Sequence, residues 1–194
     1  MREVEVKGVV ADPAALRERL LAAGAREVYS GALSDVRFDT HEGALLAVDH
    51  VLRLRRTGAR EAVVDWKGPT SQADGFKVRE EISSPCGDGA AMRRIVEQLG
   101  YHPIHEIDRE IEQFAWQDVT LRIERYPRMD VLLEVEGEPA AIDAVIAALE
   151  LDRAAFTAER LADFVARYEA RTGERAAVSV REAAGDYSLR GSLR

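Results

Sequence analysis

Charged and apolar residues alternate along several short segments of this chain. Near its start, Glu3, Glu5 and Lys7 share one parity, and Val4 and Val6 occupy the other. Successive side chains of an extended segment point to opposite faces, so this alternation predicts a β-strand with one charged and one apolar face. An edge strand with one wet face would explain a single segment of this kind. The recurrence of the pattern needs a wider explanation.

Seven further segments repeat the alternation, which predicts about eight strands in all. They cover residues 34–40, 50–56, 61–67, 76–82, 107–115, 119–124 and 131–137. Residues 57–60, which include Gly58, predict a hairpin turn between the third and fourth strands.

Other segments carry apolar residues at helical spacing and predict amphipathic helices outside the strands. They cover residues 12–24, 88–99, 138–149 and 157–170. In the second of these helices we assign Met92, Ile95, Val96 and Leu99 to the core. We expect one domain over residues 1–172. Residues 173–194 have no such period and predict a C-terminal tail that is flexible or loosely docked.

Composition narrows the classes of function. The chain has 194 residues, of which 46% are hydrophobic, and this is enough for one sizeable core. It has 27 Lys and Arg against 35 Asp and Glu, a formal net charge of -8. This balance argues against non-specific binding to nucleic acid or to an anionic membrane. Any anionic ligand must therefore meet a local basic site.

Cysteine usage suits a reducing compartment, and the hydropathy predicts no membrane-spanning segment. Cys86 is the only cysteine, so the chain can form neither an internal disulfide nor a cysteine-based zinc site. No stretch of about 18 apolar residues is present, and no signal-like apolar run follows Met1. We expect a cytoplasmic protein, monomeric or homodimeric, with no nucleic-acid or membrane partner.

Two architectures fit the alternating strands. One is an open sheet with a wet face. The other is a closed barrel whose lumen holds the charges while helices cover the apolar outside. The barrel explains why helices with apolar faces alternate with such densely charged strands. Its lumen would contain Lys7, Arg53, Arg55, Lys67, Lys77, Arg79, Arg109 and Arg122 beside Glu3, Glu5, Glu81, Glu124, Glu134 and Glu136.

Such a lumen makes a chemical demand, because buried charges are costly unless they are paired, hydrated or neutralised by a ligand. Guanidinium and ammonium groups bind phosphate oxygens, and carboxylates bind hard cations such as Mg or Mn. Both kinds together indicate metal-assisted phosphoryl chemistry. The chain has no GxxxxGK, GxGxxG or HExxH motif, so common nucleotide and protease sites are absent.

The order of these residues resembles the CYTH domain proteins, also called triphosphate tunnel metalloenzymes, which include class IV adenylate cyclases and thiamine triphosphatases. The resemblance extends to about residue 170. Its motifs are Glu-x-Glu-x-Lys at 3–7, the segment at 35–39, Leu-Arg-Leu-Arg at 52–55, Trp-Lys-Gly-Pro at 66–69, Lys-Val-Arg-Glu-Glu at 77–81 and Leu-Leu-Glu-Val-Glu-Gly at 132–137. The stretch 125–129 resembles the class IV cyclase subgroup.

The resemblance implies an α+β fold in which an eight-stranded antiparallel β-barrel tunnel, with helices packed outside, binds a triphosphate end-on. It implies that Mg or Mn is held by Glu3, Glu5, Glu134 and Glu136, with Glu124 as a further candidate. The implied phosphate-binding residues are Lys7, Arg53, Arg55, Lys67, Lys77, Arg79, Arg109 and Arg122, with Lys7 and Arg55 catalytic. One departure concerns Arg109, because the family often has a lysine just before it and this chain has Ile107 and Asp108.

Three functions remain open at this stage. The first, favoured by the subgroup resemblance, is an adenylate cyclase that converts ATP to cyclic AMP and pyrophosphate. The second is a triphosphatase that hydrolyses tripolyphosphate, thiamine triphosphate or a nucleoside triphosphate. The third is a non-catalytic module that binds polyphosphate. The Glu-x-Glu-x-Lys motif favours an enzyme, because a pure anion receptor has little need for so many carboxylates.

Overall fold

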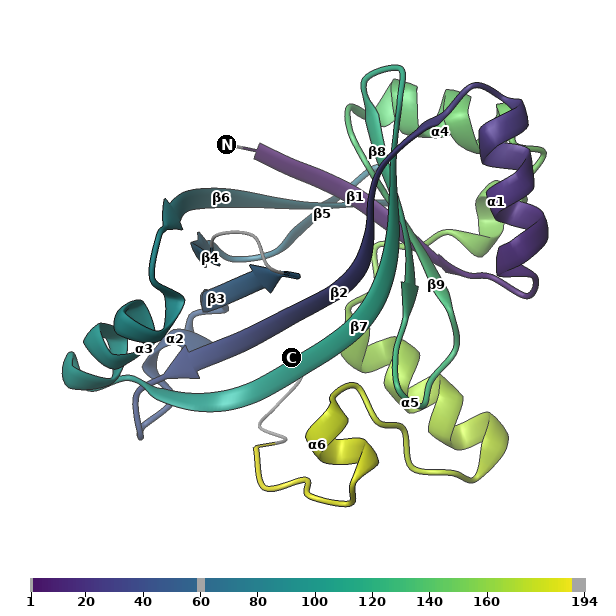
Figure 1. Ribbon diagram of the computed structural model, residues 1–194. Coiled ribbons are helices and arrows are strands. Elements are labelled where there is room, and N and C mark those ends of the chain that lie inside the picture. Colours follow the sequence, from purple (N-terminus) through teal and green to yellow (C-terminus); the bar gives the residue numbers. More distant parts are fainter. Residues whose placement is uncertain (1, 59–61, 190–194) are drawn as a thin grey trace.

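Eight antiparallel strands close into a barrel in the computed structural model, which describes residues 2–58 and 62–189 (Figure 1). The order around the barrel is β1-β9-β8-β7-β2-β3-β4-β6, and β6 pairs back onto β1. These strands are β1 (Arg2–Val9), β2 (Arg26–Asp39), β3 (Val51–Thr57), β4 (Ala62–Lys67), β6 (Phe76–Cys86), β7 (His102–Trp116), β8 (Val119–Arg125) and β9 (Leu132–Glu136). A short strand, β5 (Ser71–Ala73), pairs with the start of β6. The predicted α+β class with an eight-stranded barrel is confirmed.

The helices lie outside the barrel (Figure 1). They are α1 (Pro13–Ala22), α2 (Ala44–Ala47), α3 (Gly89–Gln98), α4 (Pro139–Ala148), the 3-10 helix η1 (Arg153–Ala155), α5 (Leu161–Thr172) and α6 (Val180–Ala183). Asp12 caps α1 by accepting a hydrogen bond from the backbone N–H of Ala15, and Pro13 fits the first turn. Among the described residues, no helix is long and apolar enough to cross a membrane.

Strands β2 and β7 are longer than the sequence predicted. They begin at Arg26 and His102, and they pair with each other over most of their length. The early part of β2 does not alternate cleanly, because the register shifts between Glu27 and Tyr29 and because Gly31 adopts a φ of 143°. The predicted hairpin turn over 57–60 falls partly outside the described residues.

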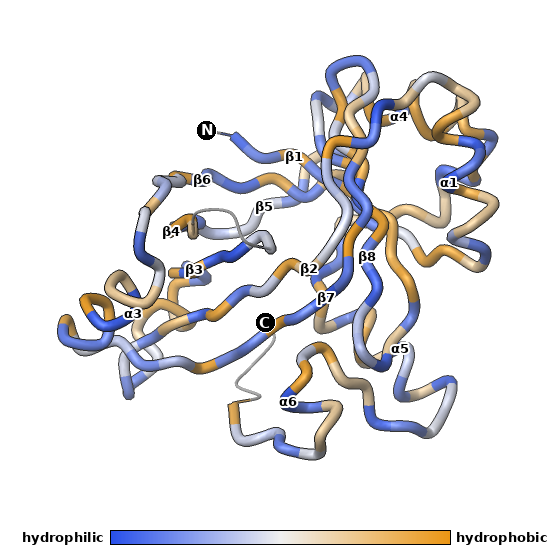
Figure 2. The backbone as a smooth tube through the Cα atoms, in the orientation of Figure 1, coloured by the Kyte–Doolittle hydropathy of each residue, from blue (hydrophilic) through white to orange (hydrophobic). Residues whose placement is uncertain are grey.

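The apolar core lies between the barrel and its helices, as Figure 2 shows where apolar segments of the two face each other. Val6 on β1 packs in one cluster with Leu20 of α1 and Ile146 of α4, and all three are at most 1% exposed. A second cluster joins Phe164 of α5 to Ile107 of β7. Each such buried side chain contributes roughly 1.5–3 kcal/mol. The strand residues of the first cluster thus face outward, and the other parity is left for the lumen, which Ile107 also lines.

Helix α3 corrects one sequence-based expectation. Val96 is buried, but Ile95 is 53% and Leu99 is 71% exposed, so these two are not core residues. The helix lies beyond one end of the barrel (Figure 1), where it finds less surface to cover than α1 or α4. Helical periodicity identifies an apolar face but does not reveal how much of that face another element covers.

The segment after α5 packs onto the barrel as far as residue 189, which differs from the expected loose tail. Ala176, Ala177 and Val178 are fully buried. The backbone N–H of Asp108 donates to the carbonyl of Val178 at 2.8 Å, and Arg128 and Ala177 exchange two backbone hydrogen bonds. The buried run Ala176–Val178 and these backbone hydrogen bonds dock this segment, and so short a run carries no helical period. Residues 190–194 lie outside the described part of the chain.

Candidate active site

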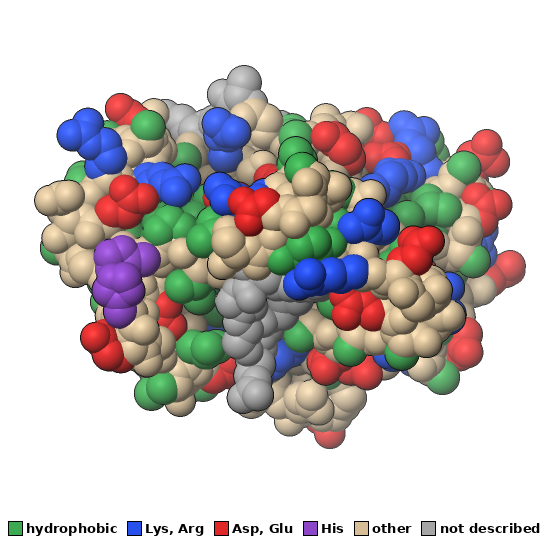
Figure 3. Space-filling model, turned by 90° about the horizontal axis from the view of Figure 1, so that it is seen from below, with side chains coloured by type: hydrophobic (Ala, Val, Ile, Leu, Met, Phe, Trp, Pro, Cys, Tyr) green, Lys and Arg blue, Asp and Glu red, His purple; other side chains and the backbone are tan. Residues whose placement is uncertain are grey.

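A charged cavity of about 230 Å³ occupies the lumen of the barrel. Every residue that the alternation assigned to the lumen lines this cavity, with the exception of Glu124. On the outside of the molecule, the face shown in Figure 3 also carries interspersed basic and acidic side chains.

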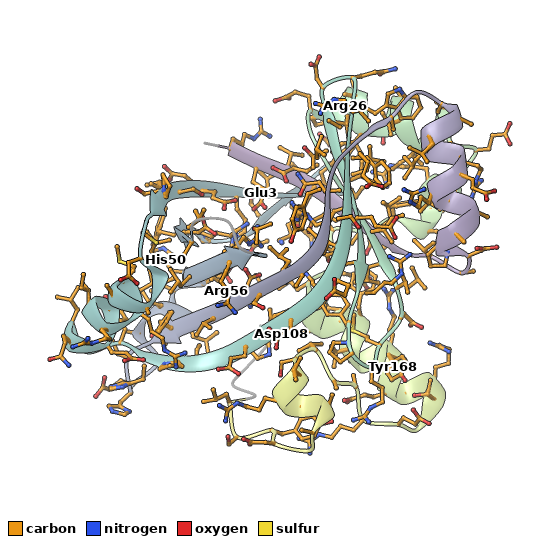
Figure 4. The ribbon with its side chains drawn as sticks, in the orientation of Figure 1. Glu3, Arg26, His50, Arg56, Asp108 and Tyr168 are labelled. Atoms are coloured by element: carbon orange, nitrogen blue, oxygen red, sulfur yellow. The ribbon has the colours of Figure 1, made fainter. Side chains whose placement is uncertain are left out.

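Strand β1 separates an acidic wall from a basic one. On its β9 side, Glu5 stands opposite Glu136, and Lys7 stands opposite Glu134. On its β6 side, Glu3 stands opposite Arg79, and Glu5 stands opposite Lys77. Figure 4 marks the position of Glu3 on this wall. The antiparallel register thus places carboxylates next to carboxylates on β1 and β9, with basic groups on the flanking strand.

Lysines neutralise these carboxylates. Lys67 Nζ lies 2.6 Å from Glu3 Oε1, Lys77 Nζ lies 2.5 Å from Glu5 Oε1, and Lys7 Nζ lies 2.7 Å from Glu134 Oε2. Burial alone would lower the pKa of Lys7, but Glu134, Glu124 and Glu5 outweigh it and hold that pKa well above its usual value. Lys7 is therefore charged, and all three lysines line the lumen.

On the opposite wall, the carboxylate of Asp35 contacts three arginines. It accepts hydrogen bonds from Arg55 Nε at 2.8 Å and from Arg109 Nη1 at 3.0 Å, and Arg53 Nη1 lies 3.6 Å away. Burial would raise the pKa of Asp35, but Arg55, Arg53 and Arg109 hold it well below its usual value. Asp65 holds Arg53 in the same way, with two hydrogen bonds of 2.8 and 2.6 Å.

Neither aspartate was assigned to the site from the sequence. Asp35 shares the parity of the charged positions in its strand, and so does Asp65, so the signal was present. Arg160 also lines the cavity and was missed. It precedes α5 and makes a two-point contact with Asp49, at 2.9 and 2.8 Å, across 111 positions of the sequence. No local sequence pattern predicts a contact between residues so far apart in the chain.

Glu124 lies behind the cavity wall and is fully buried. Its Oε1 accepts a hydrogen bond from Arg109 Nε at 2.8 Å, and its Oε2 accepts one from the Tyr126 hydroxyl at 2.7 Å. Arg122 pairs with Glu134 on the neighbouring strand. Both oxygens of Glu124 thus have protein partners, and its part in metal binding stays a prediction.

Two observations show that the β1 and β9 carboxylates fit a hard cation. Glu3 Oε2 is buried and has no hydrogen-bond partner among the described residues. Burial raises the pKa of Glu136 to about 7, and the negative charges of Glu134 and Glu3 add to this effect. Oxygen donors in this number suit Mg or Mn. Within the described ranges, no three carboxylate, imidazole or thiol groups already converge on one point, because the lysines hold the carboxylates.

Comparison with known proteins places this fold. A CYTH domain model matches residues 1–168. No curated protein shows a significant sequence match. A candidate adenylate cyclase from Vibrio parahaemolyticus superimposes with a TM-score of 0.74 at 16% identity, covering 84% of this chain and 97% of that one. A protein from Pyrococcus horikoshii gives a TM-score of 0.68 at 16% identity, covering 84% of this chain and 98% of its own.

A third solved structure is a candidate adenylyl cyclase from Hippeastrum described by a dominant triphosphatase activity. It gives a TM-score of 0.61 at 15% identity and covers 89% of this chain and 96% of that one. At such identities these neighbours show the shared fold, and the chemistry of this chain has to be argued from its own lumen.

Proposed function

The chain belongs to the CYTH domain family, and on that premise we propose that it is a metal-dependent enzyme acting on a triphosphate bound in the barrel lumen. The observation that carries the proposal is the sorting of charge along the cavity. Four of the carboxylates that line the cavity come from β1 and β9, and most of its basic side chains come from the other strands. A phosphate chain with a divalent cation is complementary to both parts.

In this proposal the ligand displaces contacts that the protein makes with itself. Glu3, Glu5, Glu134 and Glu136 would hold Mg or Mn. The bound cation would supply Lewis-acid polarisation of the phosphoryl oxygens. Lys67, Lys77 and Lys7 are then released from Glu3, Glu5 and Glu134, and their ammonium groups become available to the phosphates. The remaining phosphate-binding candidates are Arg53, Arg55, Arg79, Arg109 and Arg122.

Arg55 and Lys7 are the proposed catalytic residues. The guanidinium of Arg55 is held on Asp35 by hydrogen bonds of 2.8 and 3.1 Å, which restrict its orientation before the substrate arrives. A positioned cation stabilises the charge that shifts in phosphoryl transfer more than a mobile one does. Lys7 is held by Glu134 only in the ligand-free site, and its ammonium becomes available to the phosphates when the ligand binds.

Hydrolysis is the reaction that the cavity supports best. Its volume of about 230 Å³ is below the roughly 300–1,000 Å³ of pockets that enclose larger organic ligands. Its apolar lining is limited to Val51, Ile107, Tyr126 and Leu161. The lumen therefore suits a phosphate chain. We propose that water attacks the terminal phosphorus, that a new P–O bond forms, and that the bridging P–O bond breaks to release orthophosphate and the shortened chain.

Cyclisation of ATP is the second candidate, because residues 125–129 resemble the class IV cyclase subgroup. In that reaction the 3′-hydroxyl attacks the α-phosphorus and pyrophosphate leaves, so the ribose has to reach the phosphate-binding groups. The sequence alone favoured this reaction. The small cavity moves the preference to hydrolysis.

Phosphorus NMR of the protein with tripolyphosphate, thiamine triphosphate or ATP distinguishes these functions. Each substrate is incubated with Mg, with Mn and with chelator. Metal-dependent release of orthophosphate establishes the triphosphatase. Cyclic AMP with pyrophosphate establishes the cyclase. Absence of turnover together with thermal stabilisation by the ligand leaves the third function, a binding module.

A further inference from the structure

Arg37 lines the lumen on the wall that faces the carboxylates. It lies on β2, which is four strand pairings from β1 in either direction around the barrel. Arg37 also lines a smaller cavity that adjoins the lumen beside α2, together with Leu46 and His50. A ligand bound to the carboxylates of β1 and β9 would therefore reach Arg37 on its far side.

Arg37 differs from the other lumen cations in its lack of a partner. Within the described part of the chain, its guanidinium makes no hydrogen bond or ion pair, and its Nε is buried without an acceptor. Arg79, by comparison, donates to the carbonyls of Gly68 and Asp49 at 2.7 and 2.8 Å. The remaining lumen cations pair with carboxylates, as Arg53 does with Asp65.

The surroundings of Arg37 are positive. Burial lowers its pKa to about 10, and the nearby Arg53 acts in the same direction. The carboxylate that opposes this effect is that of Asp35, whose oxygens already accept hydrogen bonds from Arg55 and Arg109. Burying a charged guanidinium here is unfavourable because no hydrogen bond or ion pair from the described residues compensates for its lost hydration. An anion in the lumen would supply that compensation.

We propose that Arg37 binds a phosphoryl group of the ligand and thereby sets how far a phosphate chain must extend from the metal-binding wall. The planar guanidinium offers a fork of N–H donors that matches two phosphoryl oxygens. This assignment rests on the proposed function, because it takes a phosphate chain as the occupant of the lumen. It adds to the site a ligand-binding residue that the sequence analysis left out.

Calorimetric titration with inorganic tripolyphosphate tests the assignment, in chelator and in Mg. Arg37→Gln should weaken binding about ten- to hundredfold, as loss of a charged hydrogen-bond donor does. Arg37→Lys should retain part of the affinity. The melting temperature of the ligand-free Arg37→Gln protein should be unchanged or higher, because no hydrogen bond or ion pair within the described part of the chain is lost. Arg56→Gln, on the outer face of β3, is the matched control and should change neither quantity.

Two outcomes in the Arg37→Gln variant overturn the assignment. One is an unchanged dissociation constant in Arg37→Gln. The other is a ligand-free melting temperature that falls, which would make Arg37 a structural residue. The proposed enzyme fails separately, since a wild-type protein that binds tripolyphosphate without turnover still permits the affinity comparison. A wild-type protein that does not bind tripolyphosphate would contradict both the assignment of Arg37 and the proposed function.

Discussion

Lys67 Nζ lies 2.6 Å from one oxygen of Glu3, while the other oxygen, Oε2, is buried and has no hydrogen-bond partner among the described residues. The same ammonium lies 2.9 Å from Glu81. Lys67 can therefore leave Glu3 without losing its last carboxylate, and Glu3 can turn both oxygens to a cation. Under the proposed function, a metal and a phosphate would replace these pairings.

Replacing Glu3 with Gln should greatly reduce metal-dependent turnover. The amide keeps the shape of the side chain but removes the negative charge, so we expect the rate to fall by on the order of 100-fold or more. Turnover of tripolyphosphate measured against Mg and Mn concentration checks this. Glu5→Gln should behave in the same way, because Glu5 faces Glu136 across the β1–β9 pair. Full activity in both variants would show that the metal assignment is wrong.

Arg55 and Arg56 provide a matched pair on one strand. Arg55 lines the lumen, and its neighbour Arg56 is exposed on the outer face. Arg55→Gln should lower kcat/KM by on the order of 100-fold, as removal of a positioned charge-stabilising donor does. Arg56→Gln should leave kcat/KM unchanged. Steady-state kinetics with a triphosphate substrate checks the difference, and equal effects in the two variants would remove Arg55 from the site.

The lumen could be predicted from the sequence because side-chain parity alone decides which face a strand residue occupies. Glu3, Glu5 and Lys7 therefore appear in the cavity as expected. Closure of the sheet could be argued only from the repetition of that parity. The pairing of β6 with β1, which closes the barrel, joins residues more than seventy positions apart.

Contacts within the site were less predictable. The same parity rule places Asp35 and Arg37 in the lumen. It does not show that Asp35 contacts three arginines, or that the guanidinium of Arg37 has no hydrogen-bond or ion-pair partner among the described residues. These differences depend on side-chain directions across the barrel. The exposure of Leu99 depends likewise on how the barrel ends beneath α3, which no local pattern encodes.

Tyr126 should stabilise the fold through Glu124. Its hydroxyl donates to Glu124 Oε2, a fully buried atom whose next basic neighbour, Lys7 Nζ, is 3.7 Å away. Tyr126→Phe leaves that oxygen without its close donor and should lower the free energy of unfolding by about 1–3 kcal/mol. Urea denaturation measures this. Tyr168→Phe is the control, because the Tyr168 hydroxyl makes an exposed contact of 3.4 Å and its loss should have little effect.

The segment after α5 should belong to the cooperative unit. A chain that ends at Thr172 loses the fully buried Val178, whose burial is worth roughly 1.5–3 kcal/mol. It also loses the backbone hydrogen bonds to Arg128. We expect a lower melting temperature with substrate turnover retained in the cold, since the lumen residues precede the cut. An unchanged melting temperature would instead support the domain boundary at residue 172 that the sequence suggested.

The pKa of Glu136 predicts how stability depends on pH in the absence of metal. Burial and the neighbouring Glu134 and Glu3 raise this pKa to about 7, above the roughly 4.3 of an unfolded chain. The folded protein therefore binds more protons than the unfolded one in this interval. Its stability should fall as pH rises from about 4.3 through 7. Thermal unfolding in chelator, followed from pH 5 to 8, should show this decline.

Glu136→Gln should flatten that decline, because the amide does not titrate. Glu110→Gln, at an exposed position of β7, is the control and should retain the wild-type slope. Added Mg should also flatten the wild-type curve, since a bound cation stabilises the ionised carboxylate. A wild-type slope that persists in Glu136→Gln would assign the titration to another group. A slope that Mg leaves unchanged would show that Glu136 is not one of the metal ligands.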